Sequence, residues 1–382
     1  MTSSSSGSIP SSRTAAAPTG RFTDVPGVRI GHYHRHSATW RTGTTVVVAE
    51  SGAVAGVDVR GGGPGTRETD LLRPENLVSQ VHAICLTGGS AFGLAAADGV
   101  MLELERRGRG FPVGEQGALV VPIVPTAVIF DLGRAGPADH RPDRDFGARA
   151  TRAAFGRLGT TSLQGAIGAG IGARAGGLQG GVGTASTSID LLGSIPSSAA
   201  AGPQTSVPMS IPKTVTVSAV AVVNAVGSII DPRTALPWER LPPEFSPRLR
   251  TPNAADRRRL LDHLSSLAAR RSPPLNTTIG IVATDLPLTK AECTKVAAVA
   301  HDGLARAIRP AHSMHDGDTI FALSTGEQLL VGRPPWWPTA MNLVLRAAAD
   351  MFAAACTRAV VEAVHVGGPP SFRDLCPSAF GE

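Results

Sequence analysis

The chain has 382 residues, a length that suits one large domain or two small ones. Hydrophobic residues make up 42 % of it but aromatic residues only 4 %, so a sizeable core must be built from Ala, Val, Ile and Leu. No apolar run approaches the length of a membrane span, and the N-terminus lacks the apolar core of a signal peptide. The four cysteines have no metal-ligand spacing and are expected to be buried, reduced thiols. We therefore expect a soluble, cytoplasmic protein with no membrane partner.

The net charge of +6 is concentrated in one segment, residues 247–275. It holds seven arginines against two aspartates, which leaves the rest of the chain nearly neutral. No basic stripe interleaved with aromatic residues is present elsewhere, so the charge does not indicate a nucleic-acid partner.

In chain order, residues 1–20 are predicted to be a disordered tail, because they lack large apolar residues. Two strand-like runs over residues 44–59 end in a glycine-rich loop. A strand, a Gly-Gly-Ser turn and a helix from about Ala91 to Arg107 follow, and residues 121–132 form another strand.

The middle of the chain is glycine-rich at residues 161–186 and strand-like at residues 214–231, with a flexible insertion at residues 191–213 between them. A flexible linker over residues 232–276 contains one amphipathic helix. After Thr277 the pattern predicts strand, helix, strand and a long helix to about His365. Strands and helices are grouped rather than alternating, which favours an α+β fold.

The glycine-rich runs do not indicate a nucleotide or any other cofactor. The run at residues 60–70 lacks the Lys-Ser/Thr of a phosphate-binding loop, and the run at residues 168–176 lies in no clear βαβ unit. Close backbone packing or a backbone oxyanion site explains them better. His301, His312 and His315 lack further ligands at zinc-like spacing, so we interpret them as helix-surface and loop residues and predict no metal.

Two stretches point to chemistry. Asp316 and Asp318 lie two apart, so an extended Gly317 would put both carboxylates on one face of a strand entrance, although a capped turn is an equal alternative. In "LNTTIG", a threonine exposed by cleavage of the preceding bond would carry its own base, the α-amino group. The alternative for this stretch is an ordinary turn before a strand.

Several motifs in order, among them "VRGGGPGTRETDLL", "LTGGSAFGLAAADGVM", "AVVNAVGSIIDP", "NTTIGIVATD" and "HSMHDGDTIFALSTG", resemble the S58 (P1) peptidase family. That family includes D-aminopeptidase, β-aminopeptidases and nylon-oligomer hydrolases. The resemblance spans residues 22–326 and the C-terminal helix. It implies a four-layer αββα sandwich of the ornithine-acetyltransferase-like type and a self-cleaving N-terminal-nucleophile hydrolase acting on a small peptide or amide. It also implies a homo-oligomer, for which we expect a tetramer of cut chain pairs.

By the same resemblance, the chain is cut between Asn276 and Thr277 into a large chain, residues 21–276 after the tail, and a small chain, residues 277–382. Thr277 is then the nucleophile, Asn224 the oxyanion donor, and Asp316 and Asp318 the acids that hold the new amine. The Gly88-Gly89-Ser90 turn is assigned to substrate binding.

Two positions depart from the family pattern. Gln179 stands where the family has a lysine, and Phe130 stands near the position of an active-site tyrosine and is expected to contact substrate without a hydroxyl. These losses leave two alternatives open: an acyltransferase of the ornithine-acetyltransferase type, and a processed binding protein with feeble catalysis.

Overall fold

The computed structural model of the chain describes residues 20–194, 212–245, 247–268, 276–327 and 333–381. The tail expected at residues 1–20, the insertion at residues 191–213 and the last seven residues before Asn276 lie largely or wholly outside these ranges. No helix in the described part is long and apolar enough to cross a bilayer.

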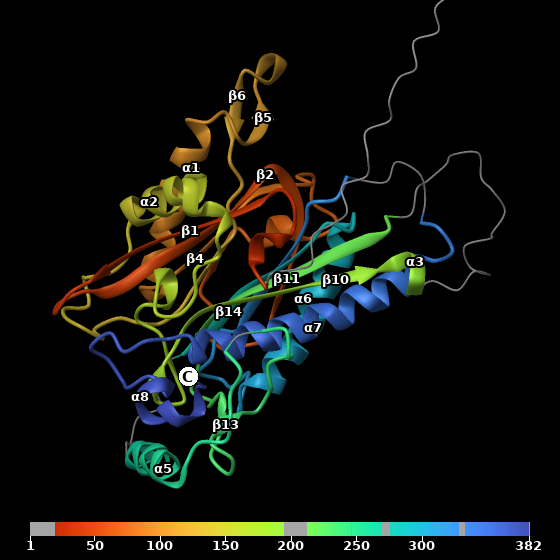
Figure 1. Ribbon diagram of the computed structural model, residues 1–382. Coiled ribbons are helices and arrows are strands. Elements are labelled where there is room, and N and C mark those ends of the chain that lie inside the picture. The colour runs from red at the N-terminus through yellow and green to blue at the C-terminus, as the bar shows by residue number, and fades with distance from the viewer. Residues whose placement is uncertain (1–19, 195–211, 246, 269–275, 328–332, 382) are drawn as a thin grey trace, which may run out of the picture.

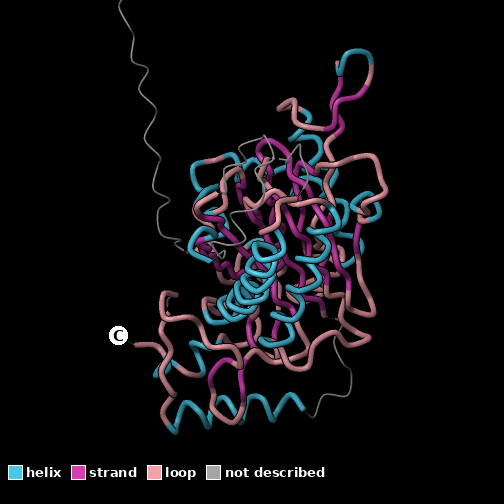
Figure 2. The backbone as a smooth tube through the Cα atoms, turned by 90° about the vertical axis from the view of Figure 1, so that its right-hand side faces the viewer, coloured by secondary structure: helices cyan, strands magenta, loops and turns pink. Residues whose placement is uncertain are grey.

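The chain forms four layers, with two β-sheets packed between two pairs of helices (Figure 1). Helices α1 (Ala96–Glu105) and α2 (Arg144–Phe155) cover one sheet, and α6 (Lys290–Ala307) and α7 (Trp337–Val361) cover the other. Turned by 90°, the strands lie in the middle of the molecule with helices outside them (Figure 2). The expected α+β, αββα architecture is confirmed.

The first sheet contains β1 (Val28–His36), the first half of β2 (Arg41–Val59), β4 (Val81–Thr87), β7 (Thr126–Val128) and β3 (Thr66–Arg67). The second contains β10 (Gly181–Asp190), β11 (Thr214–Asn224), β14 (Thr277–Thr284), β15 (Thr319–Ser324) and the second half of β2. The smaller elements are β5 (Phe111–Val113), β6 (Leu119–Val121), β8 (Arg174–Ala175), β9 (Leu178–Gln179), β12 (Ile230–Asp231), β13 (Leu236–Pro237), α3 (Leu191–Ser194), α5 (Ala254–Ala268) and α8 (Phe372–Leu375).

One long strand joins the two sheets, where the sequence predicted two separate strands. The first half of β2 pairs with β1 and β4, and its second half pairs with β15. The register against β4 shifts between Val48 and Ala53, around Gly52, whose φ is +80°. This irregularity lets the strand leave one sheet and enter the other without ending.

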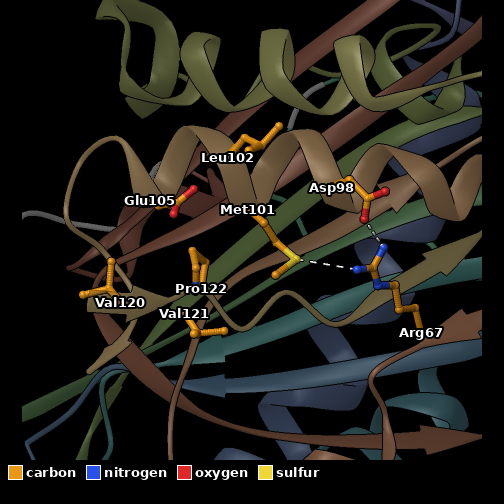
Figure 3. Close-up of a pocket in the computed structure, with 8 residues that line it drawn as sticks. All are labelled: Arg67, Asp98, Met101, Leu102, Glu105, Val120, Val121 and Pro122. Carbon is orange, nitrogen blue, oxygen red and sulfur yellow. Dashed lines mark hydrogen bonds and ion pairs between the residues drawn. The ribbon is translucent and has the colours of Figure 1, made fainter. Parts of the chain in front are cut away.

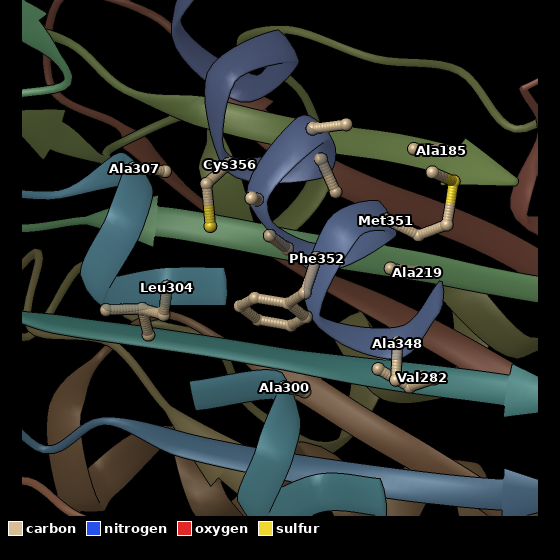
Figure 4. Close-up of a cluster of buried hydrophobic side chains, with 14 of the residues drawn as sticks. Ala185, Ala219, Val282, Ala300, Leu304, Ala307, Ala348, Met351, Phe352 and Cys356 are labelled. Atoms are coloured by element: carbon tan, nitrogen blue, oxygen red, sulfur yellow. The ribbon is translucent and has the colours of Figure 1, made fainter. Parts of the chain in front are cut away.

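Each sheet buries both faces, so its strands alternate between two cores. In β2, Val47 faces the other sheet, while Val46 and Val48 face α1 and α2. On the opposite side of the molecule, Phe352 of α7 packs among small side chains of α6 and the second sheet (Figure 4). Because alanine dominates this cluster, helix and sheet approach closely, as expected for an aromatic-poor core.

The basic segment before the proposed cleavage site differs from the exposed, flexible linker predicted for it. Its helix is present as α5, but Leu260 is fully buried, and buried Asp256 accepts hydrogen bonds from the Ser378 amide at 2.9 Å and hydroxyl at 2.5 Å. The helix lies beside α8 at one end of the molecule (Figure 1). The arginines of the helix stay at the surface while its apolar face packs against the rest of the protein. The number of charges in the segment does not reveal this packing.

Candidate functional site

The proposed nucleophile lies at the start of β14, in the middle of the second sheet. β11 runs antiparallel beside it and pairs Asn224 with Thr277. On the other side, a parallel bridge joins Asn276 to Asp316, just before β15. Strand register therefore brings together four of the residues singled out in the sequence.

The Thr277 hydroxyl faces the carbonyl group of the residue before it. Oγ1 donates a 2.6 Å hydrogen bond to the main-chain oxygen of Asn276, and Thr277 is buried. Gly317 makes room for it: a Cβ at this position would lie 2.9 Å from Oγ1 and 2.7 Å from the Gly63 oxygen. The hydroxyl thus sits beside the bond that the sequence marks for cleavage.

The two aspartates lie next to this strand but have different partners. Asp318 Oδ1 accepts from the Thr278 amide at 2.7 Å, and its Oδ2 contacts His312 Nδ1 at 2.8 Å. Asp316 Oδ2 accepts from the Ser313 amide at 2.8 Å. Burial raises the pKa of Asp316, and the neighbouring Asp318 charge adds to this against the Ser313 hydrogen bond. The pair therefore places two buried carboxyl groups beside Thr277 and Thr278.

The histidine interpretation needs correction. His301 lies inside the protein, with Nε2 3.1 Å from the Asp58 carbonyl oxygen, and burial lowers its pKa to about 4. Its ring centroid is 4.9 Å from that of His312, which in turn contacts Asp318. Only His315 is exposed. His312 therefore contacts the acidic pair directly, and His301 packs against His312, which their spacing in sequence did not indicate.

The side chain of Asn224 is fully buried and held at both ends. Oδ1 accepts from Arg134 Nη1 at 2.5 Å and from the Arg174 amide at 3.1 Å. Nδ2 donates to the Phe130 carbonyl at 3.3 Å, and an amide nitrogen carries a second hydrogen. Phe130 thus reaches the site through its main chain.

Gln179 is also fully buried. Its Nε2 lies within 3.3 Å of three carbonyl oxygens, those of Ile171, Ala173 and Gly180, an arrangement that would suit an ammonium group equally well. Arg41 lies close by, next to Gly368: a Cβ on that glycine would lie 2.2 Å from Arg41 Nη1 and 3.3 Å from Gln179 Oε1. A cation therefore stands close to the position where the family has its lysine.

The Gly88-Gly89-Ser90 turn is connected to the site through Asp131. The Gly89 amide donates to Asp131 Oδ1 at 2.6 Å, and the Ser90 amide donates to the Ile129 carbonyl at 3.0 Å. A Cβ at Gly88 would lie 2.3 Å from Asp131 Oδ2. Burial raises the pKa of Asp131 to about 6, against the lowering effects of Thr42, Gly89 and Arg134.

Three arginines that the sequence did not single out converge beside these residues. Arg41, Arg134 and Arg174 line one pocket of about 370 Å³, and Arg134 Nη2 donates to the side-chain oxygen of Asn276 at 3.2 Å. Arg174 is the only charged residue of the glycine-rich run at residues 161–186, a signal that could have identified it.

A second pocket, of about 390 Å³, lies between α1 and β6 (Figure 3). There Arg67 Nη1 pairs with Asp98 at 2.5 Å and Nη2 contacts the Met101 sulfur at 3.6 Å. None of the proposed site residues lines it, whereas Arg134 of the arginine-lined pocket bonds the side chains of Asn224 and Asn276, so the arginine-lined pocket is the better candidate for substrate.

Known proteins resemble most of the chain. A profile of Peptidase family S58 matches residues 21–371. An uncharacterized aminopeptidase of Mycobacterium tuberculosis is 47 % identical over 376 residues, covering 94 % of this chain and 99 % of the relative. A 6-aminohexanoate-oligomer endohydrolase of Paenarthrobacter ureafaciens is 30 % identical over 312 residues, covering 80 % and 74 % of the two chains.

Solved structures share the fold. The L-aminopeptidase D-Ala-esterase/amidase of Ochrobactrum anthropi, described as a variant of the Ntn hydrolase fold, superposes with a TM-score of 0.65 at 19 % identity, covering 94 % of this chain and 90 % of that one. A β-aminopeptidase of Burkholderia sp. gives a TM-score of 0.60 at 21 % identity, covering 97 % and 98 %.

Proposed function

The chain belongs to peptidase family S58 and is an amide-bond hydrolase of the Ntn fold, and from this premise we propose that it cuts itself between Asn276 and Thr277 and then uses Thr277 as its nucleophile. The observation that carries the proposal is the 2.6 Å contact between the Thr277 hydroxyl and the Asn276 carbonyl oxygen at the start of a buried strand.

In the processing step, Thr277 Oγ attacks the Asn276 carbonyl carbon. The C–N bond breaks, the acyl group moves to oxygen as an ester, and water hydrolyses this ester. The products are a chain ending at Asn276 and a chain beginning with Thr277. The new α-amino group, whose ordinary pKa is about 7.7–8.0, is then available as the base for the same hydroxyl.

The surrounding groups suit the later hydrolysis of a substrate amide. Asn224 Nδ2 is a donor for the oxyanion that forms at the attacked carbonyl, because its Oδ1 is already held by Arg134 and Arg174. Asp318 accepts a hydrogen bond from the Thr278 amide, and a parallel β-bridge joins Asp316 to Asn276. Both carboxylates can therefore hold the ammonium form of Thr277. Gln179 orders the carbonyl groups around it and is assigned no proton transfer.

Intact-mass measurement of the purified protein tests the proposal. We expect two chains that meet at Asn276 and Thr277, a single chain for Thr277→Ala, and two chains again for Thr277→Ser, which keeps a hydroxyl. A small chain beginning at any other residue would overturn the assignment. An acyltransferase would be identified by transfer of the acyl group to an added amine in preference to water.

We also propose that the cut pairs assemble into a closed, even-numbered homo-oligomer such as a tetramer. Hairpin β5–β6 projects from the body of the protein (Figure 1), and Leu119 and Val121 on it are exposed, as is Phe92. Apolar residues displayed in this way favour contact with another copy. Light scattering after size exclusion should give a multiple of two protomers, and a monomer at micromolar concentration would contradict the proposal.

A further inference from the structure

The pocket beside the proposed cleavage site carries an excess of positive charge. Its walls include Arg41 from the start of β2, Arg134 from the loop after β7, and Arg174 from β8, and none of the described residues that line it is acidic. Among the described residues, Asp131 is the carboxylate that acts on Arg134. Three guanidinium groups thus share one pocket in which the described lining residues supply no carboxylate.

The hydrogen bonds that Arg134 makes to the described residues do not neutralise its charge. The contacts of Arg134 go to neutral acceptors: the Gly172 carbonyl at 2.7 Å and the side-chain oxygens of Asn224 and Asn276. Burial lowers the pKa of Arg134 to about 10, and repulsion from Arg174 and Arg41 contributes. Arg41 Nε is buried and has no hydrogen-bond partner among the described residues. Burying such a cluster of cations costs free energy unless an anion binds to it.

The pocket is closed on one side by α5, the helix that precedes the cleavage site. Its His263 contacts the Gly177 carbonyl at 3.0 Å, and both His263 and Leu267 line the pocket. On another side, the chain at Gly368 approaches Arg41 so closely that a Cβ would lie 2.2 Å from Nη1. The main chain at Gly368 therefore packs directly against the Arg41 guanidinium group.

The uncut chain shows which half of a substrate would meet these charges. In processing, Asn276 is the acyl half of the bond that Thr277 attacks, and its side-chain oxygen is the group bound by Arg134 Nη2. A substrate forms the same ester with Thr277, so its acyl half takes the place that Asn276 vacates. A carboxylate has the shape of the Asn276 carboxamide and adds a negative charge.

We propose that the enzyme selects amides whose acyl half carries a carboxylate, bound by Arg41, Arg134 and Arg174 where the uncut chain places the Asn276 side chain. This rests on the proposed function, because it takes Thr277 as the nucleophile. Thr277 Oγ bonds to the acyl carbon, the C–N bond breaks, and the amine leaves with the hydroxyl proton. Water then hydrolyses the ester and releases a dicarboxylate. A substrate with an ammonium group at this place is repelled by all three arginines.

The length of the Asn276 side chain defines the probes. From its main-chain carbonyl carbon to its side-chain carbonyl carbon, asparagine has the four-carbon spacing of a succinyl group. Succinyl-, succinamoyl- and 4-aminobutyryl-p-nitroanilide therefore place a carboxylate, a neutral amide and an ammonium near the same point. On the mature protein we expect kcat/KM to be about tenfold higher for the succinyl than for the succinamoyl compound, and lowest for the aminobutyryl compound.

Substitutions test whether the preference for the carboxylate comes from the arginine pocket or from the overall charge of the protein. Arg41→Gln and Arg174→Gln should each lower the ratio of succinyl to succinamoyl kcat/KM, whereas Arg41→Lys should keep more of it. Arg346→Gln is the matched control, because that side chain is 83 % exposed on α7 and lies outside the pocket. The ratio should also fall as salt increases. A ratio of one or below in the unmodified protein would overturn the inference, as would an equal fall with Arg346→Gln.

A binding measurement separates this inference from the proposed function. Calorimetry with succinate and the neutral diamide succinamide should show tighter binding of succinate, by about tenfold, and loss of this difference in Arg41→Gln. Equal binding of the two would overturn the inference even if the chain cuts itself and hydrolyses amides. A chain that stays uncut would contradict the proposed function, and the preference for succinate over succinamide in binding would then be the test of the inference.

Discussion

Arg134 donates a 2.5 Å hydrogen bond from Nη1 to the side-chain oxygen of Asn224. This contact fixes the orientation of the amide: its oxygen is held by a cation, so its nitrogen is the end left to donate. The same guanidinium binds the side chain of Asn276 through Nη2. One arginine thereby connects the proposed oxyanion donor with the residue before the proposed cleavage site.

Arg134→Lys should slow self-cleavage. A lysine keeps the charge but cannot bond Asn224, Asn276 and Gly172 together, as the fork of an arginine does. Losing one such charge-assisted contact costs about 1.5–3 kcal/mol, which corresponds to about a tenfold to hundredfold slower reaction. The cut fraction should be followed by mass spectrometry after synthesis. Arg149→Lys, on the exposed face of α2, is the control; equal rates for the two variants would contradict the role of Arg134.

Gln179→Met should destabilise the protein more than Gln179→Lys. Methionine removes the donor from three buried carbonyl groups, at about 1–3 kcal/mol, whereas an ammonium group has three N–H donors for the same acceptors. The free energy of unfolding should be measured by urea titration in the Thr277→Ala background, where we expect a single chain. Equal losses for the two variants would show that these hydrogen bonds do not determine the choice of residue.

The stability of the fold should depend on pH through Asp131. Its pKa is about 6 in the folded protein against an ordinary value of 3.8, so the folded state binds the proton more tightly than the unfolded chain. Stability from this group is therefore greatest at low pH and falls as pH rises from about 4 to about 6. Between pH 5 and pH 7 the unmodified protein should lose about 1.4 kcal/mol relative to Asp131→Asn. Urea titrations at the two pH values test this, and parallel curves would contradict it.

Helix α5 should resist trypsin until its apolar face is undocked. Leu260 is fully buried, so Leu260→Asp should release the helix, expose Arg257–Arg259 to cleavage and raise KM for amide substrates through loss of a pocket wall. Ser265→Asp adds the same charge on the exposed face and is the matched control. Fragment masses after brief digestion report the cuts. Rapid cleavage after these arginines in the unmodified protein would show that the helix is not docked in solution.

The local pattern of the sequence was sufficient for much of the architecture. Hydrophobic periodicity predicted α6, α7, β14 and β15 within a few residues, because helices and strands that bury one or both faces must repeat apolar residues at their own period. Family motifs pointed to Thr277, Asn224 and the aspartate pair, and the register of β11, β14 and β15 brings these residues side by side.

The tertiary structure alone decided which charges surround that site. Arg41, Arg134 and Arg174 come from three separate parts of the chain, and nothing in the sequence near each one tells where the other two will lie. The same holds for α5: the sequence predicted a helix within a flexible linker, whereas in the structure the helix is docked through the buried Leu260. Periodicity is a local property that the sequence displays directly. A pocket is formed by long-range pairing and packing, so its charge becomes visible only when the strands have their register and the loops their neighbours.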